Sequence, residues 1–137
     1  VYKELVPPKS LEKVPFIKYQ TDASVANIIE TWCAEHFDEP PSVAMDVNSM
    51  STCRHFVRAG LGWSILTYMG LGSCKDKDIY VSPLRSKDGE YITRDTNMVY
   101  TKDSENLIVV KTFIEYVRNY YKEHTVVDNS IFREYKA

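Results

Sequence analysis

The sequence predicts an α/β domain in which helices flank both faces of a largely parallel sheet, giving three layers (αβα). Strand-like segments alternate with helical periods over the first half of the chain, and strand–helix–strand units favour parallel pairing with right-handed crossovers. Residues 62–66 form a mostly apolar run without alternation, which is typical of a strand covered on both faces. The chain of 137 residues, 44% hydrophobic and 26% charged, suits one globular domain and excludes bulk disorder.

The first strand is predicted at residues 14–19, which are mostly apolar and β-favouring. Pro15 suits an early strand position, where a ladder donor is dispensable. Thr21 or Asp22 then offers an N-cap oxygen for a helix that reaches Phe37. The apolar side chains of this helix recur at spacings of three and four and form one stripe: Val25, Ile28, Ile29, Trp32, Cys33 and Phe37.

A second strand is predicted at residues 42–47, followed by a helix that Asn48 or Ser49 caps. Gly60 stands where the chain leaves this helix, a position whose left-handed backbone favours glycine. The third, buried strand follows at residues 62–66. The inward side chains of the second helix are expected to be Met50, Cys53, Phe56 and Val57.

Further along, residues 70–78 are predicted to be a polar loop, 79–81 a short strand and 86–89 a turn. Another strand is expected at residues 96–100.

Asp103 or Ser104 then caps the last helix, expected at about 105–123. Its inward positions are predicted to be Leu107, Val110, Ile114, Val117 and Tyr121, with Phe113 alongside.

Charge and hydropathy exclude several classes of protein. Lysine and arginine number 17 and aspartate and glutamate 19, so the net charge of −2 does not indicate a nucleic-acid-binding surface. No apolar run approaches the roughly 20 residues of a bilayer span, and no charged-then-apolar leader indicates export. We therefore expect a cytoplasmic protein without a membrane partner. The chain begins at Val1, which is compatible with a fragment or a processed piece.

Three widely spaced cysteines, Cys33, Cys53 and Cys74, make a poor disulfide framework, so reduced thiols are expected. No His or Cys pair has zinc-ligand spacing, and no metal site is predicted. The Cys53-Arg54-His55 run suggests a thiol enzyme, because Arg54 and His55 could favour a nucleophilic thiolate. Residues one and two apart on a helix point in different directions, however, which favours a core thiol.

Polar side chains at the carboxyl ends of three predicted strands indicate a small-molecule site, because ligands of parallel sheets bind beyond those ends. Two ends precede helix N-termini, whose unpaired amides favour an anion or carboxylate, and Lys18 adds a positive charge. Plain N-capping is the alternative explanation for Asp22, Asn48 and Ser49. The residues at these ends that are predicted to bind a small molecule are Lys18, Tyr19, Gln20, Thr21, Asn48, Ser49, Thr67 and Tyr68.

No glycine-rich phosphate fingerprint follows the first strand, since residues 19–24 contain no glycine. A dinucleotide or nucleoside triphosphate is therefore not expected, and no cofactor is predicted. No carboxylate pair or Ser/His/Asp set stands at useful positions. The site is predicted to bind a small molecule and to have no catalytic residues.

Four stretches in order resemble the effector-binding (substrate-binding) domain of LysR-type transcriptional regulators. The likeness covers about residues 5–124. A proline that is common after the buried strand in this family is here Thr67. The stretches are VPFIKY at 14–19, MDVNSMST at 45–52, FVRAGLGWSIL at 56–66, and VYTKDS at 99–104 followed by FIEYV at 113–117.

The resemblance implies a two-lobed fold of the periplasmic-binding-protein type II kind and a non-enzymatic regulatory domain. A small effector between the lobes would change DNA binding by the parent protein, through a winged helix-turn-helix that this chain lacks. Lobes of this family pair through helices such as 22–37, so a homo-oligomer is expected. The implied segments are a lead-in at 1–13, the second lobe at 14–90, a return strand and helix of the first lobe at 91–124, and a C-terminal tail at 125–137.

Two other functions stay open: a solute-binding protein with the same lobe fold, which a leader in the parent gene would favour, and a Cys53-based thiol enzyme. Trp63 begins the buried strand, far from the cleft, and is expected in the core. Because most of the first lobe is missing, the helix at 105–123 is expected to expose apolar surface and to favour self-association or altered docking.

Overall fold

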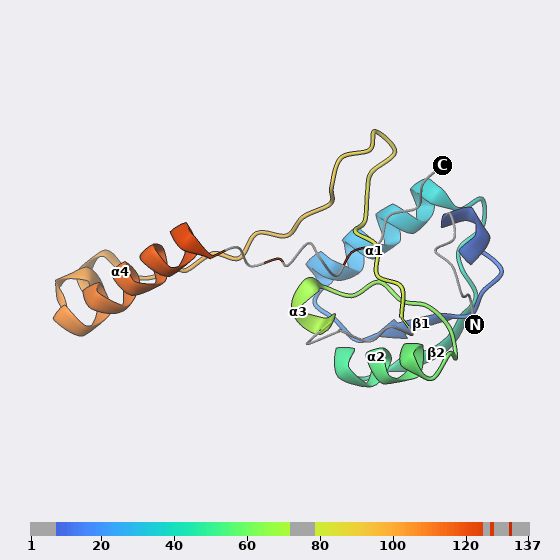
Figure 1. The fold of residues 1–137 in the computed structure, drawn as a ribbon, viewed down its shortest axis with the longest axis horizontal. Coiled ribbons are helices and arrows are strands. Elements are labelled where there is room, and N and C mark those ends of the chain that lie inside the picture. Colours follow the sequence, from blue (N-terminus) through green and yellow to red (C-terminus); the bar gives the residue numbers. More distant parts are fainter. Residues whose placement is uncertain (1–7, 72–78, 125–126, 128–131, 133–137) are drawn as a thin grey trace. The chain divides into compact units, whose positions relative to one another are not determined.

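The structure, a computed structural model, describes residues 8–71, 79–124, 127 and 132. These residues group into two compact units, one that extends to Ile92 and includes Phe132, and one that begins at Thr93. The elements in chain order (Figure 1) are η1 (Pro8–Leu11), β1 (Phe16–Tyr19), α1 (Ala23–His36), β2 (Val43–Val47), α2 (Met50–Arg58), α3 (Tyr68–Leu71), η2 (Lys102–Asn106) and α4 (Ile108–Glu123).

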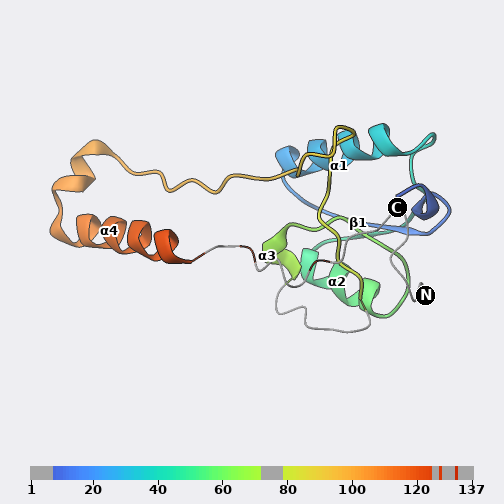
Figure 2. The same cartoon turned by 45° about the horizontal axis from the view of Figure 1, so that its top comes forward.

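The first unit is built on a parallel sheet of β1 and β2, with Tyr19 opposite Val47 in register. On the other edge of β1, Phe16 forms an isolated parallel bridge with Trp63. Helix α1 covers one face of the sheet and α2 covers the other (Figure 2). This arrangement confirms the predicted α/β fold with a parallel sheet between helices.

Helix α1 begins where the sequence places an N-cap, and Asp22 rather than Thr21 provides it. The Asp22 carboxylate accepts hydrogen bonds from the backbone N–H groups of Ser24 at 3.0 Å and Val25 at 3.1 Å. These bonds satisfy donors that have no partner within the helix.

Helix α2 begins after Ser49 and ends in a Schellman motif at Gly60, whose φ of 76° favours glycine. The Gly60 N–H donates to Val57 O at 2.9 Å, and the Leu61 N–H donates to Phe56 O at 3.1 Å. The predicted left-handed exit at Gly60 is confirmed.

The core of this unit has two parts. The first surrounds Trp32, Cys33, Phe37 and Ile65, and Trp63 packs against it as expected. The Trp63 indole also contacts Phe16 in a tilted arrangement, with ring centroids 4.7 Å apart. The second part holds Ile17, Tyr19 and Cys53, with partly buried residues of α2 and β2 packed around them.

The predicted strand at residues 62–66 is wrong in its extent, because only Trp63 makes a bridge. The Trp63 N–H donates to Pro15 O at 3.0 Å, and the Ile17 N–H donates to Trp63 O at 2.9 Å. The next acceptor, Ile17 O, instead receives the Ser64 hydroxyl at 2.7 Å. A side-chain donor thus takes the place of a backbone donor and ends the ladder, while the segment still runs parallel to β1.

The predicted strands at 79–81 and 96–100 are also wrong, since neither segment is a strand in the structure. Val99 is 90% exposed, and residues 96–100 pair with no other strand in the described part of the chain. The turn at 86–89 is confirmed by the Gly89 N–H, which donates to Ser86 O at 3.0 Å, and by a φ of 85° at Gly89. Of the predicted loop, residues 70–71 belong to α3 and 72–78 lie outside the described residues, as do residues 1–7 of the lead-in and most of the tail.

The second unit contains η2 and α4. The predicted cap at Asp103 or Ser104 is wrong, because both residues lie in η2 and α4 starts after Leu107, which makes no side-chain cap bond. The hydroxyls of Thr101 and Ser104 bond to each other instead. Ile114 is buried, but Leu107 and Tyr121, both predicted inward, are exposed. The exposed apolar and aromatic side chains of this helix region are Leu107, Ile108, Val109, Phe113, Tyr116, Tyr120 and Tyr121.

Candidate functional site

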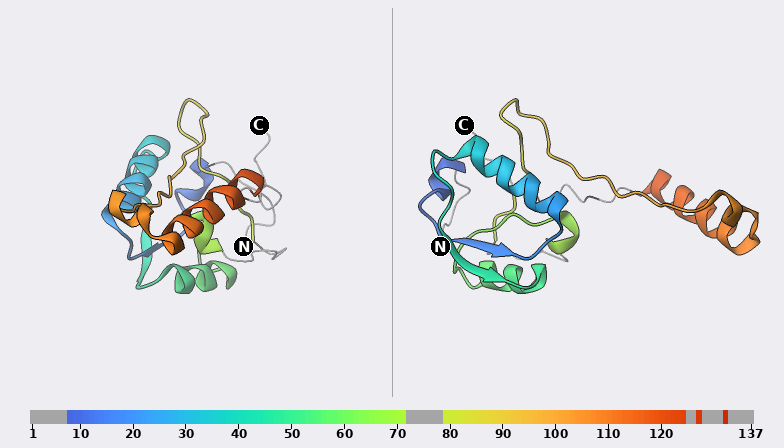
Figure 3. Two further views of the ribbon diagram at one scale, coloured as in Figure 1. Left: turned by 90° about the vertical axis from the view of Figure 1, so that its left-hand side faces the viewer. Right: turned by 180° about the vertical axis from the view of Figure 1, so that it is seen from behind.

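The carboxyl ends of three extended segments lie side by side at one edge of the first unit. Strand β1 runs parallel to β2 on one side and to the segment at Trp63 on the other. The Gln20 N–H donates to Val47 O at 2.9 Å, so pairing continues one residue past β1. Both strand arrows in Figure 3 point toward the side of the unit where α3 lies. The topology therefore brings the predicted site segments 18–21, 48–49 and 67–68 to the same edge.

The predicted site residues differ in how far they reach solvent. Tyr19 is 3% exposed, because its ring belongs to the core between β1 and α2. Lys18, Gln20 and Asn48 are exposed, and Thr21, Ser49, Thr67 and Tyr68 are half-buried. Seven of the eight are thus accessible to a small molecule at this edge.

Ser49 is the N-cap of α2. Its hydroxyl oxygen accepts the Thr52 N–H at 3.1 Å and lies 2.9 Å from the Thr52 hydroxyl. Capping therefore accounts for Ser49, as it does for Asp22 at the start of α1. Asn48 takes no part in the cap and is exposed beside it.

The third group of site residues comprises Thr67 and the first residue of α3, Tyr68, and α3 is held against α2. The Thr67 hydroxyl donates to the Met50 sulfur at 3.4 Å, and the Tyr68 ring lies 6.3 Å from the ring of Phe132. From α2, Arg54 Nη1 donates to Gly70 O at 3.3 Å and to Leu71 O at 3.1 Å. Sequence reasoning missed α3 and its contacts with α2, because a four-residue helix held by a distant side chain leaves no local pattern.

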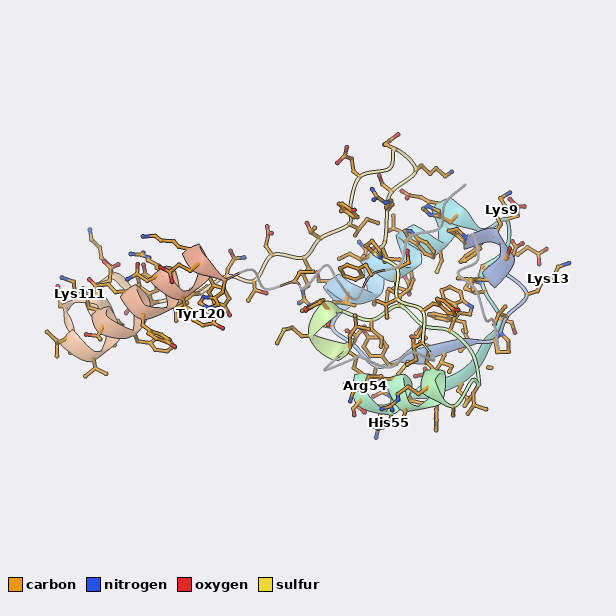
Figure 4. The ribbon with its side chains drawn as sticks, viewed as in Figure 1. Lys9, Lys13, Arg54, His55, Lys111 and Tyr120 are labelled. Carbon is orange, nitrogen blue, oxygen red and sulfur yellow. The ribbon has the colours of Figure 1, made fainter. Side chains whose placement is uncertain are left out.

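The structure does not bring Cys53, Arg54 and His55 together as a thiol enzyme requires. Cys53 is 0% exposed, and its Sγ donates to Ser64 Oγ at 3.1 Å. Burial raises the pKa of this thiol, and the Ser64 hydrogen bond only partly opposes the rise. His55 lies on the exposed side of α2 (Figure 4) with its Nδ1 2.8 Å from Ser51 O. The arrangement favours the alternative of a protonated core thiol.

Cys33 is also a buried thiol. Burial, with a smaller contribution from Glu30, raises its pKa from 9.0 to about 11. Across residues 8–71 and 79–124, no group of three or more His, Cys, Asp and Glu side chains could hold a metal ion. None of the helices in the described part of the chain combines the length and apolar character of a bilayer span.

The sequence of this chain is similar to one protein family and to two curated proteins. Residues 2–122 match the family described as "LysR substrate binding domain". The chain is 34% identical over 118 residues to the uncharacterized HTH-type transcriptional regulator YraN of Bacillus subtilis (strain 168), a match covering 86% of this chain and 40% of that protein. It is 27% identical over 105 residues to the uncharacterized HTH-type transcriptional regulator YkuM of the same organism, covering 77% and 35%. The chain therefore spans less than half the length of these relatives, and no solved structure matches it significantly.

Proposed function

This chain belongs to the LysR substrate-binding domain family, and we propose that it is the effector-sensing part of a longer transcriptional regulator. The family match and the description of both relatives as transcriptional regulators support a regulator over a solute-binding protein of the same fold. In this role the domain performs no chemistry. It binds a small molecule, and binding changes how the parent protein holds DNA.

The observation that carries the proposal is the convergence of three parallel segment ends at one edge of the sheet. The effector contacts come from residues 18–21, 48–49 and 67–68. Within this set the exposed side chains of Lys18, Gln20 and Asn48 supply charge and amide groups, while Tyr19 and Ser49 support the edge through the core and the α2 cap.

An anion or carboxylate is the effector class that the site favours. The Lys18 ammonium is exposed at this edge, and the amides of the first turn of α2 carry partial positive charge. The two helix N-termini are not equivalent, because the carboxylate of Asp22 caps α1 and repels an anion, whereas the neutral hydroxyl of Ser49 caps α2. The acidic group of the effector therefore binds toward α2.

The proposed domain division places residues 14–90 in the second lobe and 91–124 in a return to the first lobe. Support comes from the two compact units, which divide after Ile92. The remaining wall of the cleft, and the winged helix-turn-helix that binds DNA, then belong to parts of the regulator outside this chain. The lobes pair in a homo-oligomer through helices such as α1.

Regulation proceeds as a population shift. An effector that binds one arrangement of the lobes more tightly increases the population of that arrangement, and the coupling to DNA binding is reciprocal. The arrangement of the DNA-binding parts in the oligomer then changes without any covalent step.

The test is a thermal-shift and calorimetric screen of acetate, succinate, glutamate and benzoate on the longer protein that contains this chain. We expect one carboxylate to stabilise the wild type, with the stabilisation largely lost in Lys18→Gln. The control is Lys13→Gln, which removes the same charge at the amino end of β1, away from α3 (Figure 4). Absence of stabilisation by every carboxylate, or equal loss in both variants, would contradict the proposed site.

A further inference from the structure

The short helix α3 is seated on the first half of α2 by three contacts. The Thr67 hydroxyl donates to the Met50 sulfur at 3.4 Å. Gly70 lies directly against the Met50 side chain, and Arg54 Nη1 donates to the last two carbonyls of α3, at Gly70 and Leu71. Helix α3 therefore depends on side chains that come from another element.

Gly70 allows the close approach between the two helices. A Cβ atom built at Gly70 would lie closer than 3.0 Å to both Sδ and Cγ of Met50, a separation that real Cβ atoms essentially never show. Any larger residue at this position must displace the Met50 side chain, which also accepts the Thr67 hydroxyl.

Arg54 holds the other end of α3. Its positive charge bonds to the terminal carbonyls of the helix, where a cation is favourable. The Arg54 Nε–H, however, is buried and has no hydrogen-bond partner in the described part of the chain. A buried donor without an acceptor offsets much of what the Nη1 bonds contribute to global stability. Arg54 therefore acts mainly by ordering α3 and contributes little to the free energy of unfolding of the whole unit.

We propose that Arg54 and Met50 are positioning residues for the effector site. By fixing α3 on α2, they set where Thr67 and Tyr68 lie at the edge formed by the segment ends. Neither residue needs to touch the effector, and the inference rests on the proposed function of this edge as the effector site.

The first arm of the test uses the longer protein without any effector. The Gly70 N–H donates to Thr67 O at 2.8 Å, so its hydrogen exchange reports the order of α3. We expect about tenfold faster exchange in Arg54→Met, which keeps an aliphatic stem, and near wild-type exchange in Arg54→Lys, which keeps a donor. Lys13→Met, which removes the same charge from an exposed side chain before β1, should leave exchange unchanged. The thermal midpoints of all three variants should stay close to that of the wild type.

The second arm measures binding of acetate, succinate, glutamate and benzoate to the longer protein. We expect Arg54→Met to weaken binding of the carboxylate that the wild type binds by about fivefold or more. Arg54→Lys should keep most of this affinity, and Lys13→Met should have no effect. Unchanged exchange at Gly70 in Arg54→Met overturns the inference, as does faster exchange with unchanged affinity. If the wild type binds none of the four compounds, the proposed carboxylate site fails and the positioning role falls with it, whereas the exchange result still shows whether Arg54 orders α3.

Discussion

Gly62→Ala should separate the 62–66 segment from β1, because the added methyl group meets backbone. A Cβ atom at Gly62 would lie closer than 3.0 Å to Pro15 O and 3.2 Å from Ile17 Cγ1. Pro15 O is fixed in the sheet and accepts the Trp63 N–H at 3.0 Å, so it cannot move aside as a flexible side chain could.

The expected loss follows from the contacts that separation would weaken. These are two backbone hydrogen bonds, worth about 1 kcal/mol each, and the contact between Phe16 and Trp63, worth roughly 0.5–1.5 kcal/mol beyond its buried area. Gly62→Ala should therefore lower the free energy of unfolding by about 2–4 kcal/mol. The matched variant Gly89→Ala adds a methyl group at a φ of 85° with nothing within 4 Å, and should cost only about 1 kcal/mol.

Urea unfolding followed by tryptophan fluorescence measures this difference. The chain has two tryptophans, Trp32 and Trp63, and both pack in the same core cluster, so the signal reports the first unit. We expect a midpoint about 1–2 M lower in Gly62→Ala. A loss below about 1 kcal/mol, or equal losses in both variants, would refute the reasoning that the close approach at Gly62 holds the third segment in place.

Three further predictions concern other parts of the chain. The free energy of unfolding should fall as the pH rises from about 9 to about 11, because the pKa of the Cys33 thiol is 9.0 in the unfolded chain and about 11 in the folded one. Urea titrations at several pH values measure this fall, and Cys33→Ala should make it smaller. The isolated chain should self-associate through α4, because exposed side chains such as Val109 and Phe113 each contribute roughly 1.5–3 kcal/mol when buried. The double variant Val109→Ser with Phe113→Ser should be a monomer in sedimentation velocity. A monodisperse wild-type monomer would contradict this prediction. Ser49→Ala should cost about 1 kcal/mol of stability by removing the α2 cap, whereas Asn48→Ala should leave the urea midpoint unchanged and weaken effector binding to the longer protein; equal midpoints for both variants would contradict the capping role.

The elements that depend on local signals could be predicted from the sequence. Helix α1 runs over Ala23–His36, within two residues of the predicted ends, because its apolar stripe and the Asp22 cap are both encoded in consecutive residues. The same holds for the Gly60 exit and the turn at 86–89.

The strands at 62–66 and 96–100 could not be predicted in the same way, because a strand exists only where a neighbour completes its ladder. At 62–66 the Ser64 hydroxyl takes the acceptor that would have continued the pairing. At 96–100 no described strand lies alongside. Propensity alone contains neither fact.

The candidate site was predictable where it follows from topology and hidden where it depends on tertiary contacts. Parallel pairing places the segment ends at one edge whatever their side chains are. The seat of α3 instead requires Arg54 to reach residues 16 and 17 positions further along the chain. Adjacency to Cys53 suggested a catalytic role for Arg54, whereas its contacts assign it to a helix end.

At Ser64 a side-chain hydroxyl, and not a backbone N–H, donates to Ile17 O, and this difference affects which residues near the site can vary. A strand that is hydrogen-bonded to its neighbour at every second residue tolerates few local changes, because a backbone shift at one position breaks hydrogen bonds at others. Backbone pairing between β1 and this segment stops at Ile17, so Thr67 and Tyr68 can be replaced without breaking a backbone hydrogen bond to β1. If these residues contact the effector as proposed, the specificity of the site can change while the pairing of β1 with β2 is kept.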